Sequence, residues 1–312
     1  MDPAHLATLR AVRAHGGVTA AAAVRHLTPS AVSQQLAALQ REAAVPLTER
    51  VGRGLRLTPA GEALADAALD VAVAVERARA ACDAFVARPV GTVRVSAFSS
   101  GAQMLLPGLL TRVAALDGVT LECSDEDVAQ DEFVALTDRV DVVVAHRPDG
   151  SAGWGPDVVV VPLLREPLDV AVPLDHPLAD RAAVTPADLA DAPWIAVRHG
   201  FPVARVLDEV AARTGTEPRV VHRINDFAVV EALVAAGHGV SLLPRWTARA
   251  GDGVRFRLLP LEGVRAGRHV DALLRPDRAE RRVVRRVLDE LRALAADAPG
   301  PAPAPPGGGR GG

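Results

Sequence analysis

Short polar side chains occupy one face of a predicted helix near the start of the chain. This face consists of Ser30, Ser33, Gln34, Ala37 and Arg41. Hydroxyl, amide and guanidinium groups of this kind hydrogen-bond to base edges and phosphate oxygens in a DNA groove. The opposite face consists of Val32, Leu36 and Leu39, spaced four and three residues apart. This pattern predicts an amphipathic helix whose small outer side chains allow it to enter a groove.

The residues before this helix predict a second, shorter helix packed against it. We expect Thr19 to cap that helix, whose small apolar run ends at Leu27. Thr28-Pro29 then breaks it, because proline disfavours helical geometry in the preceding residue and suits an early position of a new helix. Two helices joined by a tight corner are typical of a helix-turn-helix with its recognition helix second. For residues 17–40 alone, an ordinary helical hairpin is an equally good interpretation.

An arginine-rich turn follows the helix pair and favours the first interpretation. Two short strands, 45–47 and 55–57, are expected to pair around a turn at residues 52–54 and form a small wing. The arginines of this wing are Arg50, Arg53 and Arg56. An arginine at a glycine-flanked turn reaches a phosphate or the adjacent minor groove. A solvated turn is the alternative, but its position directly after a helix pair favours DNA contact.

A long helix, predicted from Ala60 to Ala87, follows the wing. Apolar residues recur along it with a 4-3 spacing, which is typical of a seam for a partner helix. This seam consists of Leu64, Ala68, Val71, Val75, Ala78, Cys82 and Phe85. Packing against its own chain is the alternative, but a dimer explains the length better, because two recognition helices can then meet two half-sites.

From residue 91 the pattern changes to Val-rich strands that alternate with helices. Buried strands such as 93–98 and 141–146 predict a parallel, doubly wound α/β sheet. We expect helices at 103–116 and 128–139, and a last helix near 277–296. The predicted first lobe comprises residues 91–160 and 267–297, and the second comprises residues 161–266. Two α/β lobes joined by two crossovers bind small molecules in the cleft between them.

Several polar residues are expected to line that cleft. Ser99 and Ser100 open a helix whose free N–H groups suit a carboxylate, and Arg147 suits bidentate pairing with an acid. The full set is Ser99, Ser100, Asp125, His146, Arg147, His199, Phe201 and Asn225. A helix cap at Ser99, a surface salt bridge at Arg147 and a solvated loop at Asp125 are the ordinary alternatives. The mixture of cation and carboxylates points weakly to an organic acid or a zwitterion such as an amino acid.

Length and composition limit the remaining classes. The chain has 312 residues, which suits two or three domains, and a net charge of -3. No phosphate loop, nucleophile elbow or metal-type spacing of His and Cys occurs, so we predict neither an enzyme nor a cofactor or metal. Cys82 and Cys123 fall in different predicted domains, which favours a reduced, cytoplasmic protein. No apolar segment suggests export or a membrane span, and the Pro/Gly-rich tail at 298–312 is expected to be disordered.

The N-terminal segments resemble those of the LysR-type transcriptional regulators. The resemblance rests on SAVSQQLAAL in the second helix, followed by VPLTER and RLTPAG. VPLLREPLDVAVPLDHPLA and GHGVSLLP resemble stretches of the family's C-terminal domain. The resemblance implies a winged helix-turn-helix at 1–59, a linker helix at 60–88 and a two-lobed effector domain of periplasmic-binding-protein type at 91–297. Gln34 departs from the family's usual arginine or lysine, Thr48 from its phenylalanine, and Gly17 and Ala20 from a serine and a basic residue.

The resemblance also implies partners and site roles. A dimer of dimers would bind an interrupted inverted repeat in double-stranded DNA, in the nucleoid, with RNA polymerase as a further partner. The residue matching Ser99 commonly contacts the effector. The DNA contacts that we predict come from Thr19, Pro29, Ser30, Ser33, Gln34, Arg41, Arg50, Arg53 and Arg56. A cytoplasmic binding protein with an unrelated N-terminal domain, and a thiol-based redox sensor resting on Cys123, remain as alternatives.

Overall fold

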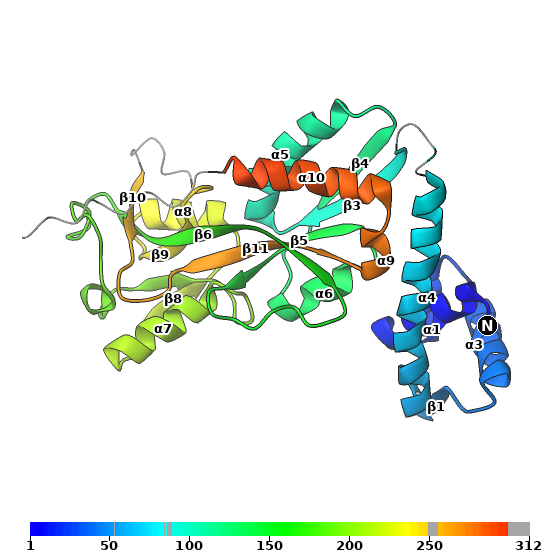
Figure 1. Ribbon diagram of the computed structural model, residues 1–312. Helices are drawn as coiled ribbons and strands as arrows, with labels where there is room; N and C mark the ends of the chain where they lie inside the picture. Colours follow the sequence, from blue (N-terminus) through cyan, green and yellow to red (C-terminus); the bar gives the residue numbers. More distant parts are fainter. Residues whose placement is uncertain (53, 84, 86–88, 249–254, 299–312) are drawn as a thin grey trace, which may run out of the picture.

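The chain folds into a small N-terminal helical domain, a long helix and a two-lobed α/β domain (Figure 1). This computed structural model describes residues 1–312 except 53, 84, 86–88, 249–254 and 299–312. The predicted disordered tail therefore lies outside the described residues, apart from Ala298. The three parts follow one another along the chain in the predicted order.

Three helices form the N-terminal core: α1 (Pro3–His15), α2 (Val18–Arg25) and α3 (Pro29–Ala43). Helix α3 begins as predicted, because Pro29 is its first residue and the Thr28 Oγ1 accepts a hydrogen bond from the Ala31 N–H at 3.1 Å. Its apolar face is buried in the domain core: Val32, Leu36 and Leu39 are 0, 7 and 0 % exposed. Thr28-Pro29 thus correctly predicted the start of α3, and the apolar spacing correctly predicted the face that it buries.

The predicted caps of α2 differ from the observed ones. Gly17 is the N-cap residue and supplies no side-chain bond, so Thr19 lies inside the first turn instead of capping it. The helix ends at Arg25 rather than at Leu27, because His26 adopts a left-handed conformation with φ of 54°. Its backbone N–H still bonds to the α2 carbonyls, which satisfies the end of the helix.

The wing is an antiparallel hairpin of β1 (Thr48–Val51) and β2 (Gly54–Leu57). The first strand lies three residues later than the predicted 45–47. Leu47 does not belong to β1, because its N–H donates to Gln40 Oε1 at 3.2 Å and its carbonyl accepts from the Thr58 N–H at 3.1 Å. A Cβ at Gly61 would lie 2.0 Å from that carbonyl oxygen, so only glycine permits this close approach of α4.

Helix α4 (Pro59–Asp83) carries the predicted seam, but its two halves lie in different surroundings. Ala68 is 3 % exposed and, with Leu64, packs into the core of the N-terminal domain. Val71 is 37 % exposed and, with Val75, borders a cavity shared with the effector domain, whereas Ala78 and Cys82 are exposed. Phe85, predicted as the last seam residue, lies in a turn beyond the end of α4. The start of the seam therefore packs on its own chain, and Ala78 and Cys82 are its exposed part. The end predicted at Ala87 lies outside the described residues.

The first lobe is built on a sheet of β3 (Gly91–Ala97), β4 (Val119–Asp125), β5 (Val142–Pro148) and β11 (Gly267–Leu274). β3 pairs in parallel with β4 and β5, as predicted, but β11 runs antiparallel to β5 and β6 (Val159–Pro173). The sheet is therefore mixed, because the chain returns from the second lobe in the opposite direction. Helices α5 (Ser99–Ala114) and α10 (Arg282–Ala296) pack together over it (Figure 1).

The second lobe continues from the far half of β6. There β6 pairs with β9 (Ser241–Pro244) and β10 (Phe256–Pro260), while β7 (Trp194–Ala196) and β8 (Val220–Arg223) form a separate parallel pair. Its helical elements are η2 (Pro186–Leu189), α7 (Ala204–Thr214) and α8 (Phe227–Ala235). The partners of β6 change between Pro167 and Leu168, so the lobe boundary lies inside this strand and after the predicted residue 161.

Three predicted helices have different bounds. The helix predicted at 128–139 is only η1 (Gln130–Glu132) followed by α6 (Phe133–Leu136). The last helix divides into α9 (Pro276–Ala279) and α10. Helix α5 begins at Ser99, four residues before the predicted Gln103. This early start matters for function, because it places the first turn of α5 directly at the edge of the cleft.

Candidate effector cleft and nucleic-acid interface

A cavity of about 370 Å³ lies where the two lobes meet. From the first lobe it is lined by the start of α5, by the end of β5 and by the start of β11. From the second lobe it is lined by the segment after β7 and by the start of α8. Its lining comprises Phe98, Ser99, Ser100, Gln103, Asp127, His146, Val197, Arg198, Phe201, Val203, Asn225, Asp226, Phe227, Ala228 and Arg268. This size suits a small metabolite.

The first turn of α5 forms one wall of the cavity. Phe98 is its N-cap residue and cannot cap it with a polar side chain, so the leading N–H groups have no side-chain acceptor. Phe98 lies beneath this turn, and a Cβ at Gly101 would approach its ring to 2.6 Å. Glycine therefore allows the helix to rest on the ring, with the exposed Ser99 at the rim. Such a helix end favours a negatively charged group.

His146 lies at the floor of the cavity and is 3 % exposed. Its ring packs against Phe98, with centroids 4.3 Å apart, and meets the edge of Phe133. Burial, and to a lesser extent the charge of Arg268, holds the pKa of His146 well below its ordinary value of 6.5. Nδ1 has no hydrogen-bond partner among the described residues. His146 is therefore a neutral imidazole that still has a polar atom available.

Arg268, which the sequence analysis did not select, is the most buried cation of the cleft. It is 1 % exposed and forms an ion pair with Glu166 at 2.6 Å, which is itself 0 % exposed. It also donates to Ser100 Oγ at 2.8 Å, and its guanidinium lies 4.7 Å from the centre of the Phe98 ring. Ser100 is thus an internal support of the cleft rather than an open ligand group.

The second lobe contributes Arg198 and Asn225. Arg198 is exposed and lies 5.5 Å from the Phe201 ring centre, and its N–H donates to Asn225 Oδ1 at 2.8 Å. The Asn225 Nδ2 is buried and has no partner among the described residues. Asp226 caps α8, because its Oδ1 accepts from the Ala228 N–H at 2.8 Å. Arg198 is a second cleft cation that the sequence analysis missed.

Asp127 supplies the carboxylate on the cavity side of the loop after β4. The residue is exposed, but desolvation of its carboxyl group raises its pKa above the ordinary value, an effect that the charges of Arg268 and Arg198 partly offset. A raised carboxyl pKa means that the negative charge gains from a cation placed beside it. Asp125, the residue predicted from this loop, lies at the exposed end of β4 and does not line the cavity.

Two further predicted residues lie outside the cavity. Arg147 follows His146 on β5, and its Nε donates to Asp271 Oδ2 at 2.8 Å, so the ion-pair alternative is the observed one. Successive strand residues point to opposite faces, which separates it from His146. His199 lines a neighbouring hollow instead, although Phe201 borders both.

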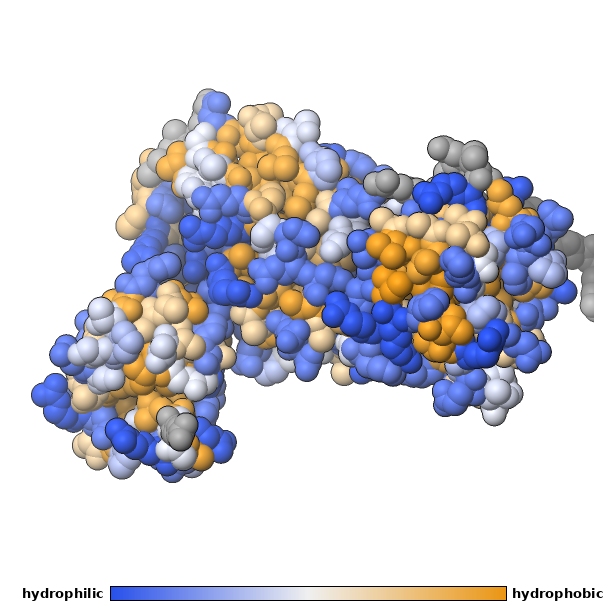
Figure 2. Space-filling view, turned by 180° about the vertical axis from the view of Figure 1, so that it is seen from behind, coloured by the Kyte–Doolittle hydropathy of each residue, from blue (hydrophilic) through white to orange (hydrophobic). Residues whose placement is uncertain are grey.

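The predicted DNA-facing side chains share an exposed surface. Ser30, Ser33, Gln34 and Arg41 are exposed along α3, and Arg50 and Arg56 are exposed on the wing; Arg53 lies outside the described residues. Ser33 Oγ donates to the Pro29 carbonyl at 3.0 Å, which leaves its lone pairs free to accept. Figure 2 shows the N-terminal domain projecting from the rest of the molecule, with hydrophilic residues at its far end. This placement suits entry of α3 into a groove.

The two cysteines are not bonded to each other. Both are free and exposed, and Cys123 lies in β4 while Cys82 lies in α4. Desolvation raises the pKa of the Cys123 thiol, which lowers the fraction of reactive thiolate. Within the described residues no group of His, Cys, Asp and Glu side chains could hold a metal ion. No helix in that part of the chain is long and apolar enough to cross a membrane.

The fold and its two surfaces define a class of protein: a winged helix-turn-helix DNA reader joined to a domain that binds a small molecule. Residues 3–62 match the family model of the bacterial regulatory helix-turn-helix protein, lysR family, and residues 86–296 match that of the LysR substrate binding domain. The chain therefore belongs to the LysR family. It is a DNA-binding transcriptional regulator with an effector-binding domain.

Individual relatives agree with this assignment. The transcriptional dual regulator GltC of Bacillus subtilis is 29% identical over 227 residues, covering 70% of this chain and 72% of its own. The regulator MetR of Salmonella typhimurium is 29% identical over 272 residues, covering 81% and 82%. A full-length OxyR variant from Pseudomonas aeruginosa has the same fold, with a TM-score of 0.68 and 21% identity over 97% of this chain and 99% of that one.

Proposed function

We propose that the effector is a small molecule with a carboxylate and a neighbouring amine, and that its binding in the cleft controls how this regulator acts on DNA. The observation that carries the proposal is the facing arrangement of unlike charges around one cavity. The first turn of α5 and Arg198 attract an anion, whereas Asp127 attracts a cation. The apolar rings of Phe98 and Phe201 limit the space between them.

We expect the carboxylate of the effector to bind between the two lobes. On one side the leading N–H groups of α5 and the Ser99 hydroxyl donate to it, and on the other side Arg198 and the buried Asn225 Nδ2 do so. Charge-assisted hydrogen bonds of this type are about twice as strong as neutral ones. Since the donors come from both lobes, a bound carboxylate favours the closed cleft over an open one.

The amine is expected beside Asp127. A cation there offsets the desolvation of this carboxylate at the edge of the cavity. A simple organic acid would leave Asp127 unpaired, so we expect amino acids to bind more tightly than the matching acids without an amine. Arg268 is already neutralised by Glu166 and is not needed as a ligand group.

A thermal-shift screen of the full chain tests this proposal. Amino acids and their des-amino analogues are compared at equal concentration, and each compound that raises Tm is then titrated by calorimetry. Replacing Arg198→Gln should weaken binding about 10–100-fold, as expected for loss of one charge-assisted hydrogen bond. Arg213→Gln removes an equally exposed arginine from α7 of the same lobe and should leave affinity unchanged. Equal affinities in both variants would contradict the proposed site.

We also propose that the DNA-binding unit is a dimer on an interrupted inverted repeat. The exposed later part of α4 supports this, because Ala78 and Cys82 keep the 4-3 spacing and offer a second helix a strip of small side chains. Association of two dimers and contact with RNA polymerase belong to the same proposal. Neutral side chains on α3 would then read bases, while Arg41 and the wing hold phosphates.

A gel-shift and footprinting experiment tests the DNA interface. The Ser33→Ala/Gln34→Ala double variant should lose specific binding to the region upstream of its own gene, while its thermal unfolding stays unchanged. The matched control Ser151→Ala changes a serine far from α3. Binding by the wild-type chain should also fall steeply with salt, because bound phosphates release counterions. An unchanged footprint in the double variant would remove α3 from the interface.

A further inference from the structure

A second cavity, of about 640 Å³, lies between the N-terminal domain and the first lobe of the effector domain. Helices α1, α2 and α4 line one side with small apolar residues, among them Ala7, Ala11 and Ala72, which leave the space open. The other side is formed by the start of β3, by the segment before β5, and by the segment after β11 that includes α9. This cavity is separate from the cleft, since the two share none of their lining residues.

The charges around this second cavity are unbalanced. Its lining holds seven arginines against four acidic side chains, and one of the arginines, Arg94, pairs with Glu122 outside the lining, which leaves two positive charges uncompensated. The arginines are Arg10, Arg25, Arg79, Arg94, Arg275, Arg278 and Arg281, and the acids are Glu76, Asp138, Asp141 and Asp277. Like charges in a partly buried space repel one another, so the lining gains from an added anion.

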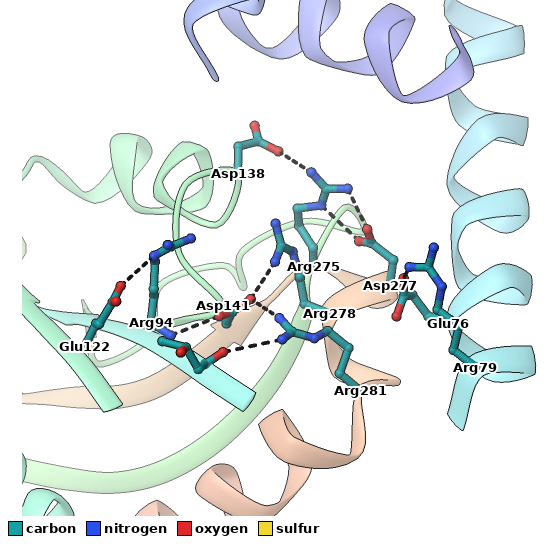
Figure 3. A network of polar contacts seen from close by, with 11 residues as sticks. Glu76, Arg79, Arg94, Glu122, Asp138, Asp141, Arg275, Asp277, Arg278 and Arg281 are labelled. Carbon is teal, nitrogen blue, oxygen red and sulfur yellow. Dashed lines mark hydrogen bonds and ion pairs between the residues drawn. The ribbon is translucent and has the colours of Figure 1, made fainter. Parts of the chain in front are cut away.

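All four acids already pair with arginines: Glu76 with Arg79 inside α4, and the other three with arginines of the effector domain (Figure 3). Arg275 holds Asp277 through two hydrogen bonds and reaches Asp138 at 3.1 Å. Arg278 and Arg281 both donate to Asp141 Oδ1 at 2.7 Å. The carboxylates therefore have little capacity left for a cation arriving from the N-terminal domain.

The two arginines that α1 and α2 contribute to this cavity, Arg10 and Arg25, lack such partners. The Nε and Nη1 atoms of Arg10 and the Nε of Arg25 are buried and have no hydrogen-bond partner within the described part of the chain. Burial, with repulsion from Arg275, lowers the pKa of Arg10 to about 10, and burial with the charges of Arg275 and Arg278 lowers that of Arg25. Buried cationic donors without an acceptor are costly, and an oxyanion satisfies several of them at once.

We propose that this cavity binds a multivalent oxyanion of the phosphate class, free or carried by a phosphorylated small molecule, between Arg10 and Arg25 on one side and Arg275 and Arg278 on the other. Such a ligand joins the DNA-binding domain to the effector domain. A single bound anion thus gives the regulator a second input that acts at the junction of its domains and is independent of the cleft.

Calorimetric titration of the full chain with inorganic pyrophosphate, free of DNA, tests the proposal. Inorganic phosphate and a nucleoside triphosphate form the two other arms and distinguish a free anion from an organic one. Sodium chloride at matched ionic strength is the blank. We expect saturable binding of pyrophosphate that chloride does not reproduce. Heat that follows ionic strength alone, with no saturation, would overturn the proposal.

Variants then locate the anion. Arg10→Gln and Arg25→Gln, made singly, should each weaken pyrophosphate binding at least about 10-fold, as expected for loss of one charge-assisted contact. If Arg10→Gln fails to fold, Arg10→Lys takes its place in the titration. This variant keeps the positive charge, so it should bind pyrophosphate with part of the wild-type affinity. Arg213→Gln on α7 and the cleft variant Arg198→Gln should both bind as the wild type does. Loss of binding in Arg198→Gln with unchanged binding in Arg10→Gln would place the anion in the cleft and refute the second site.

Discussion

Each of the two cavities contains an arginine removed from solvent, fully for Arg268 and partly for Arg10, and the surroundings of these two side chains differ. Arg268 in the cleft is 1 % exposed and has Glu166, Ser100 and the Phe98 ring around it. Arg10 in the interdomain cavity lies near Arg275 as well as near Asp277 and Asp138, and two of its nitrogen atoms have no hydrogen-bond partner among the described residues. The Arg268 guanidinium is therefore a structural group with its donors filled, whereas the Arg10 guanidinium has donors free for an acceptor from outside the chain.

This difference shows that cavity size and charge alone do not identify a ligand group. Arg268 lines the cleft, but its charge is already neutralised by the ion pair with Glu166. The exposed Arg198 is the cation that remains available there. A residue contributes to ligand binding when its donors are unfilled in the free protein, because filled donors must first give up a partner.

Replacing Glu166→Gln should cause the largest loss of stability. It leaves the Arg268 charge buried without a counter-ion, which typically costs about 3–5 kcal/mol. Urea unfolding of the full chain measures this loss. The control Glu122→Gln removes one partner of the exposed Arg94 pair on β4 and should cost no more than about 1 kcal/mol. A loss at Glu166 as small as that at Glu122 would show that Arg268 is not held as described.

Acidification should destabilise the protein through His146. Below pH 6.5 the unfolded chain binds a proton at this position, while the folded protein keeps the buried ring neutral. Stability attributable to His146 is therefore present above pH 6.5 and falls as pH decreases below that value, by at most about 1.4 kcal/mol per pH unit.

Thermal unfolding of full-length variants between pH 7 and pH 5 measures this contribution. His146→Gln should show a shallower loss of stability across this range than the wild type. His238→Gln, which alters an exposed imidazole in the second lobe, should retain the wild-type slope. Equal slopes for all three proteins would mean that His146 takes up its proton in the folded state.

The smallest effect is expected for Arg10→Gln. This change removes a partly buried cation that lacks partners and repels Arg275, so stability should stay constant or rise by about 1 kcal/mol. The comparison is made in chloride without any phosphate, because a bound oxyanion would reverse the sign. A loss above about 2 kcal/mol would show that Arg10 already has a stabilising partner in the free chain.

The sequence predicted the parts of the fold that rest on local pattern. The spacing of Val32, Leu36 and Leu39 placed α3, and the Val-rich runs placed β3 and β5. It did not predict the antiparallel return of β11, because strand direction depends on partners distant in the chain. The 4-3 spacing on α4 also could not separate Ala68, which packs on its own domain, from the exposed Val71.

The cleft was predicted less completely than the fold. Ser99, His146, Phe201 and Asn225 line it as expected, since each follows or ends a predicted strand or begins a helix. The prediction that Arg147 lines the cleft was wrong. Successive residues of β5 point to opposite faces of the sheet, so Arg147 points away from the cavity that His146 faces. Arg268 was missed because a charged residue near the start of a strand is usually solvated, and only the pairing of β11 with β6 brings Glu166 to it.

The most direct test of the account measures DNA binding with the cleft filled and empty. The full chain is titrated onto the DNA upstream of its own gene, with and without the amino acid that the thermal-shift screen selects. For the wild type we predict a change in Kd of at least about 5-fold, or a change in footprint length. Arg198→Gln at the same amino acid concentration should show neither. The same Kd and footprint with and without the bound amino acid in the wild type would contradict control through the cleft.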